Sequence, residues 1–125
     1  TNAESNAELT VIINGIEEMS GQISIGLYTD RNDWPDDEKA FTGIFLPISG
    51  DTISYTFKDL PQGIYAVALY HDANMNEKLD KGLFRIPKEG YAFSNNVFGV
   101  FGPPKMEDAS FLLESKKEIA IEIKY

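Results

Sequence analysis

The residues with the clearest chemical potential form a polar run that directly follows an apolar stretch. Oxygen-bearing groups recur there at alternating positions. In order, they are the side chains of Asp72, Asn74 and Asn76, the backbone carbonyl of Lys78 and the side chain of Asp80. This alternation is how a tight loop wraps its oxygens around a hard cation such as Ca²⁺. The run therefore predicts a calcium site.

The same run departs from a calcium loop in two places. Glu77 stands where the glycine of the sharp turn belongs, and Leu83 stands where a bidentate glutamate belongs. Between residues 72 and 89, four acidic side chains are balanced by four basic ones, so no net charge attracts a dication. We therefore favour the alternative that Asp and Asn side chains cap their own backbone in successive Asx-turns.

His71 is the only histidine of the chain. Without cysteines, one histidine does not make a usual zinc site. As the general base of a hydrolase, acting with Asp72 or Glu89, it would need a nucleophile beside it. The sequence contains no Gly-x-Ser-x-Gly elbow, and nothing in it places Ser94 near the imidazole. We therefore favour a structural histidine and a non-enzymatic protein, with the hydrolase as the alternative.

A third candidate site is a stretch rich in aromatic, amide and glycine residues, from 91 to 104. Aromatic faces beside amide groups combine stacking with hydrogen bonding, as a carbohydrate platform requires. The candidate ligand-binding residues are Tyr91, Phe93, Asn95 and Asn96. The alternative, which we favour, is that these aromatic residues fold back and cover an open end of the domain, because a long segment must bury apolar surface to stay ordered.

The candidate site residues must be positioned by the strands that the sequence predicts. A two-residue apolar period predicts strands over 9–14, 22–27, 52–57, 109–113 and 119–125, and the apolar segment 41–47 predicts a further short strand. The wholly apolar stretch 64–70 fits a central strand covered on both faces. We expect three hairpins, pairing 9–14 with 22–27, 41–47 with 52–57, and 109–113 with 119–125. The loop 30–39 has Trp34 as its only large apolar anchor.

The predicted fold is all-β. Short strands with turn residues between them indicate a single antiparallel β-sandwich of about seven strands, immunoglobulin-like or prealbumin-like. One long loop, at about 72–108, shows no period, so it is either functional or contains short elements. We assign residues 1–8 to a disordered or tag-like N-terminus and residues 9–125 to the sandwich.

Composition excludes several classes of function. The chain has 125 residues, which suits one domain, and it has no cysteine, so disulfides, thiolate catalysis and Cys-based zinc sites are excluded. A formal net charge of -9 repels polyphosphates and anionic lipid headgroups. We therefore expect a monomer that neither binds nucleic acid nor inserts into a membrane.

Several segments resemble known families. The segment 60–65 resembles the Leu-Pro-x-Gly-x-Tyr turn and strand of transthyretin-like and carboxypeptidase-regulatory-like sandwiches. The segments 71–80, 86–96, 102–104 and 107–111, in that order and spacing, resemble the bacterial family called domain of unknown function 2141, and the similarity runs from about residue 9 to 125. Glu77 replaces a glycine common in that family, and Met106 replaces a phenylalanine.

This resemblance implies an exported bacterial domain in the periplasm, at the cell surface or in the medium, with no established activity. Taken together, we expect a non-enzymatic binding or accessory module for an extracellular peptide or carbohydrate, whose long loop is ordered by its own side chains or by calcium. The alternatives are the hydrolase that uses His71 and a purely structural envelope domain.

Overall fold

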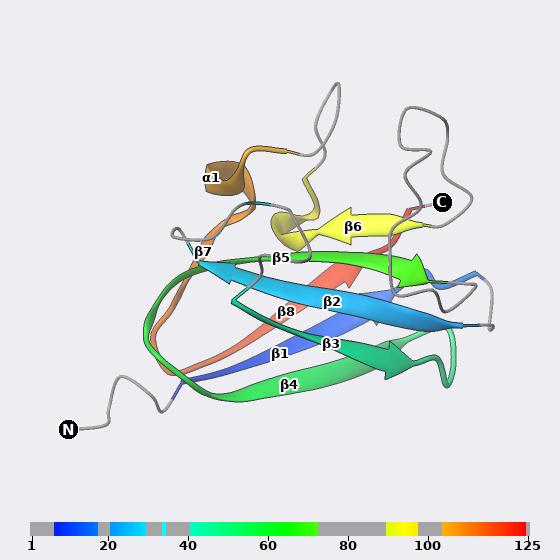
Figure 1. Cartoon of the computed structure of the whole chain (residues 1–125), viewed down its shortest axis with the longest axis horizontal. Coiled ribbons are helices and arrows are strands. Elements are labelled where there is room, and N and C mark those ends of the chain that lie inside the picture. Colours follow the sequence, from blue (N-terminus) through cyan, green and yellow to red (C-terminus); the bar gives the residue numbers. More distant parts are fainter. Residues whose placement is uncertain are drawn as a thin grey trace.

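The chain folds into two facing β-sheets, as seen in a computed structural model of residues 1–125 (Figure 1). The structure describes residues 7–17, 21–29, 34, 41–72, 90–97 and 104–124. Within these ranges the strands are β1 (Ala7–Asn14), β2 (Gln22–Thr29), β3 (Thr42–Pro47), β4 (Ile53–Leu60), β5 (Gly63–Asp72), β6 (Tyr91–Phe93), β7 (Phe111–Leu113) and β8 (Lys116–Glu122). Two short helical elements are the 3-10 turn η4 (Ser94–Asn96) and the helix α1 (Met106–Ala109).

One sheet has the strand order β4-β1-β8, and the other has the order β3-β2-β5-β6, with β7 also pairing with β5. All described pairs are antiparallel except β1 with β8, which run parallel. The predicted β-sandwich is therefore confirmed. The segment 72–108 contains β6, η4 and part of α1, so it includes short elements that its irregular sequence did not reveal.

The core lies between the sheets and is built by the alternating residues of the long strands. Every second residue of β1, beginning at Ala7, is buried, and Ile23, Ile25 and Leu27 of β2 face it. From β5, Tyr65, Val67 and Leu69 join the same cluster. Full burial of one such large apolar side chain stabilises the fold by about 1.5–3 kcal/mol.

Strand β5 is the central strand that the apolar stretch predicts. It pairs with β2 on one side and with both β6 and β7 on the other. It follows a turn in which the Tyr65 hydroxyl donates a hydrogen bond of 2.6 Å to the Pro61 carbonyl. Burial raises the pKa of this Tyr65 hydroxyl above its ordinary value.

The three predicted hairpins are wrong, although their strands exist. β1 pairs with β4 and β8, β2 pairs with β3 and β5, and β7 pairs with β5. Consecutive strands therefore often cross from one sheet to the other, because each needs a partner for its buried face as well as for its edge. In addition, β1 begins at Ala7, two residues before the predicted start of the sandwich.

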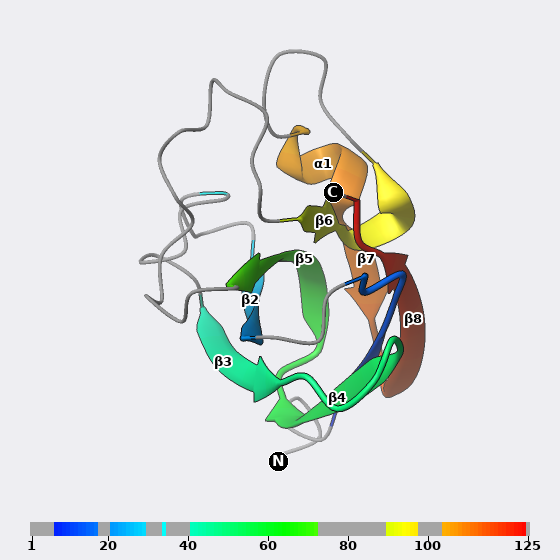
Figure 2. The same cartoon turned by 90° about the vertical axis from the view of Figure 1, so that its right-hand side faces the viewer.

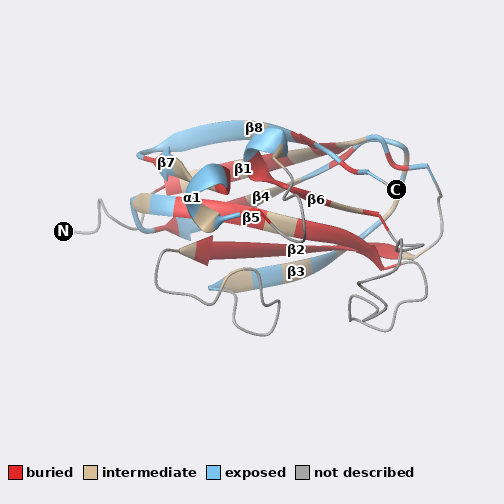
Figure 3. Cartoon of the chain, turned by 90° about the horizontal axis from the view of Figure 1, so that it is seen from above, coloured by how far each residue is buried: buried red, intermediate tan, exposed pale blue. Residues whose placement is uncertain are grey.

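The edges of the two sheets lie next to each other on two sides of the sandwich. One side is formed by β3 and β4, and the other by β6 and β8 (Figure 2). Strand β2 is buried along nearly its whole length, whereas β3 alternates between half-buried and exposed residues (Figure 3). No helix within the described ranges is long and apolar enough to cross a membrane.

Candidate functional site

β5 ends in the polar pair His71 and Asp72, whose side chains the strand pleat sends to opposite faces of the sheet. His71 pairs with the core residue Ile23 and is 1% exposed. Asp72 is 0% exposed, and its Oδ2 accepts a hydrogen bond of 3.1 Å from Gln22 Nε2. Both residues are thus built into the sheet, and one small substrate cannot approach both side chains from the same face.

Ser94 is a buried hydroxyl that joins three segments of backbone. Its Oγ accepts a hydrogen bond of 2.9 Å from the Val67 N–H and donates to the Ala109 carbonyl. This one side chain therefore ties η4 to the centre of β5 and to the end of α1. Such a fully engaged, buried hydroxyl has a structural role.

These contacts separate Ser94 from the imidazole. Ser94 lies at the level of Val67, and His71 is four residues further along the same strand. At the rise of an extended strand, this spacing is roughly 13 Å. Ser94 therefore does not form a nucleophile and base pair with His71.

Asn95 and Asn96 lie in η4 with φ values of 62° and 53°, a left-handed conformation that asparagine tolerates. Asn95 Nδ2 donates hydrogen bonds of 3.1 and 2.9 Å to the carbonyls of Asp108 and Ser110. Asn96 Nδ2 donates a hydrogen bond of 3.3 Å to the carbonyl of the β8 residue Ala120.

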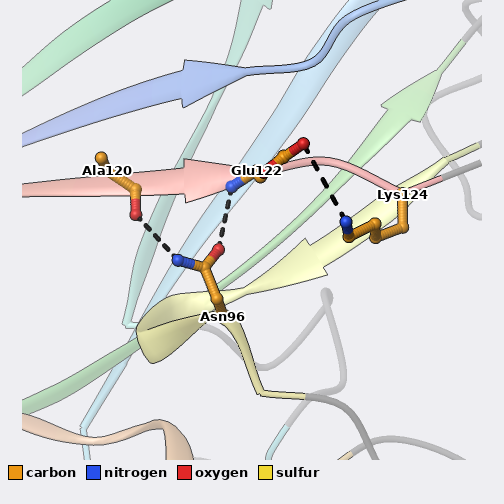
Figure 4. A network of polar contacts seen from close by, with 4 residues as sticks. All are labelled: Asn96, Ala120, Glu122 and Lys124. Carbon is orange, nitrogen blue, oxygen red and sulfur yellow. Dashed lines mark hydrogen bonds and ion pairs between the residues drawn. The ribbon is translucent and has the colours of Figure 1, made fainter.

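The Asn96 Oδ1 in turn accepts from the Glu122 N–H at 2.9 Å (Figure 4). Although exposed, both amides of η4 are thus engaged in holding neighbouring backbone.

The predicted ligand-binding aromatics lie on the outer face of the β2–β5–β6 sheet. Phe93 is buried, and its ring centroid lies 5.7 Å from that of Trp34 and 5.9 Å from that of the half-buried Tyr91. Trp34 also packs edge-on against Tyr28 at 5.0 Å, and its Nε1 donates a hydrogen bond of 2.8 Å to the Pro104 carbonyl. This tilted packing is what the covering interpretation of the aromatics expects.

The predicted calcium loop is represented by its first residue. Asp72 is described, whereas Asn74, Asn76, Lys78 and Asp80 lie outside the described residues. Among the residues that the structure does describe, no group of three or more His, Cys, Asp or Glu side chains is placed to hold a metal ion. The calcium site stays a prediction.

The candidate site that the sequence reasoning missed is the outer edge of β3. This strand pairs with β2 alone among the described strands. The Leu27 carbonyl accepts a hydrogen bond of 2.9 Å from the Phe41 N–H, so the backbone groups of Leu27 point towards β3. Because backbone groups alternate in direction along a strand, Gly43 and Phe45 of β3 direct their N–H and C=O groups to the outer edge.

The outer edges of β4 and β8 carry features that hinder pairing with a further strand. Between Phe57 and Leu60, β4 has one residue more than the β1 segment that pairs with it, which marks a β-bulge. The bulge contains the charged residues Lys58 and Asp59, and Asp59 has a φ of 57°. β8 is rich in charged residues and is covered by Asn96. Bulges, charges and covering segments all prevent a foreign strand from pairing.

β3 has neither a bulge nor a charge. The segment 41–50 contains no charged residue, and Phe45 is 43% exposed. Next to the Pro47 end of β3, a groove of about 430 Å³ is lined by Leu46, Pro47, Ile53 and neighbouring residues from β1, β4 and the connection between β3 and β4. The uncharged run ending in a proline is the signal in the sequence that could have indicated an edge strand open to a partner.

Comparison with known proteins places the chain in a family. Residues 11–121 match the model of a family described as "Uncharacterized protein conserved in bacteria (DUF2141)". No curated protein and no solved structure matches the chain.

Proposed function

The chain belongs to this bacterial family, domain of unknown function 2141, and we propose that it is a non-enzymatic binding or accessory module that takes up an extended peptide as an added strand on β3. The main support is the outer edge of β3, which, among the residues that the structure describes, lacks the charges, the bulge and the cover found at the edges of β4 and β8. In strand addition, main-chain hydrogen bonds supply affinity and side-chain pockets supply specificity.

The contacts in the aromatic and amide segment favour a peptide over a carbohydrate. Asn95 and Asn96 already hydrogen-bond to backbone, and Phe93 is buried. A sugar needs exposed aromatic faces with amides that are available beside them. The Ser94 contacts likewise speak against the hydrolase alternative.

The proposal includes export to the periplasm, the cell surface or the medium, and an immunoglobulin-like or prealbumin-like classification. Both rest on the family resemblance. Fractionation of bacteria that express the full-length protein tests the location, and recovery in the cytoplasm would contradict it.

A random library of short peptides displayed on phage is the direct test of binding. We expect enriched peptides to bind the wild-type protein and to slow amide exchange in β3. The variant Phe45→Lys, which places a charge on this edge, should weaken them by at least about tenfold. Leu112→Lys is the matched control, because Leu112 is also an exposed apolar residue of the same sheet, on β7.

The proposal predicts equal binding by Leu112→Lys and wild type. Recovery of no peptide, or binding that Phe45→Lys leaves unchanged, would overturn it.

A further inference from the structure

We infer that the partner strand is cationic, with apolar side chains at alternating positions; this inference rests on the proposed function. Three features of the open side, by which we mean β3, β4 and the groove between them, carry it. They are the direction of the β3 backbone groups, the shape of its two faces and the charge of the chain.

The backbone of β3 sets the length and register of the partner. Thr42, Ile44 and Leu46 pair with Leu27, Ile25 and Ile23 of β2, which leaves Gly43 and Phe45 with outward backbone groups. Pro47 stands at the next outward position, where its missing N–H interrupts no pairing within the sheet. A partner therefore forms its hydrogen bonds around Gly43 and Phe45, within a short extended segment.

The outer face of β3 offers a notch beside an aromatic ring. A Cβ on Gly43 would lie 3.1 Å from the Ile25 carbonyl oxygen, so this position stays without a side chain. The neighbouring Phe45 ring is 43% exposed. A side chain of an added strand can lie over Gly43 and contact the face of Phe45.

The inner face favours apolar partner residues. Ile44 and Leu46 are only half-buried, although both pack against the core. The groove at the Pro47 end continues this surface to the buried Ile53 of β4. Because side chains of a strand alternate between faces, every second residue of the partner would complete the burial of this row.

Charge distinguishes a cationic peptide from a second copy of this chain. Each copy has a formal net charge of -9, so pairing two β3 edges would bring like charges together. A segment with Lys or Arg residues is instead attracted over long range. Since the segment 41–50 is itself uncharged, the basic residues belong at the flanks of the added strand, towards the exposed Asp51 at one end.

Two synthetic peptides test the inference. Both contain a core of alternating valine and threonine, with a pair of lysines at each end in one and a pair of glutamates at each end in the other. Binding to the full chain is measured by fluorescence anisotropy at low and high salt. We expect the lysine-flanked peptide to bind at least about tenfold tighter at low salt, with the ratio falling as salt screens the charges.

N-methylation tests the mode of binding. In the lysine-flanked peptide, one version is methylated at the backbone nitrogens of the valines and another at those of the threonines. Because alternate residues face β3, one version should lose binding and the other should keep it. Equal loss in both versions would overturn strand addition.

The outcomes separate the two proposals. If both peptides slow amide exchange in β3 with equal affinity, the charge inference is wrong and the proposed function stands. If neither peptide binds, or if the chain sediments as a dimer whose β3 amides are protected, both the inference and the peptide-binding function are wrong.

Discussion

The two sides of the sandwich differ in how their sheet edges are finished. On the closed side, formed by β6, η4 and β8, Tyr91 and Lys124 exchange backbone hydrogen bonds of 3.0 and 3.1 Å. Asn96 adds two further bonds to β8. On the open side, the described residues include no pairing between β3 and β4, and a groove of about 430 Å³ lies there instead.

This difference shows where the molecule avoids strand pairing and where it permits it. An exposed edge strand invites association, so natural sheets usually blunt their edges. Here the closed side uses Asn96, in a left-handed conformation, to cover the edge of β8. The open side retains an uncharged edge with an exposed phenylalanine, which supports a binding role for β3.

The largest expected loss of stability comes from Ser94→Ala, on the closed side. It leaves the buried Val67 N–H and Ala109 C=O without the hydroxyl that joins them. We expect the free energy of unfolding to fall by about 3 kcal/mol, measured by urea denaturation. Ser54→Ala, at an exposed position of β4, is the control and should change it by less than about 0.5 kcal/mol. Equal stability of both variants would show that Ser94 does not hold the closed side together.

A smaller effect is expected for Asn96→Gly. Glycine keeps the left-handed backbone at φ 53° without strain, so the change removes mainly the amide bonds to Ala120 and Glu122. We expect a loss of about 1 kcal/mol and faster amide exchange at Glu122. Asn95→Gly should leave the Glu122 amide protected, because Asn95 bonds to other carbonyls. Unchanged amide exchange at Glu122 in Asn96→Gly would contradict a stabilising role for the hydrogen bonds between Asn96 of η4 and β8.

The smallest expected effect is on the open side. Phe45→Lys should change the free energy of unfolding by less than about 0.5 kcal/mol, because the ring is 43% exposed and lies on the edge strand, outside the hydrophobic core. Thermal and urea denaturation of this variant and of Leu112→Lys provide the measurement. A loss above about 2 kcal/mol would show that Phe45 belongs to the core and that the β3 edge is not an available surface.

Sequence reasoning selects candidate residues within 71–96 and misses the outer edge of β3. The sequence offers aromatic and amide residues at 91–96 as a candidate binding stretch, but it does not show that Asn95 and Asn96 hold carbonyls in α1, in β8 and at Ser110 between α1 and β7. The pair His71 and Asp72 was recognised as polar, yet the pleat that separates the two side chains matters only once both faces of β5 are covered.

The sequence by itself determined where most strands lie and which of their residues are buried, because a two-residue apolar period is a local property of an extended chain. It also determined the central position of β5, whose apolar residues serve both faces. The tertiary structure alone decided which strands pair, as the wrong hairpins show. The apolar period indicates which face of a strand is buried, but it does not indicate which strand pairs with each of its edges. For the same reason, only the tertiary structure distinguishes the protected edges of β4 and β8 from the open edge of β3.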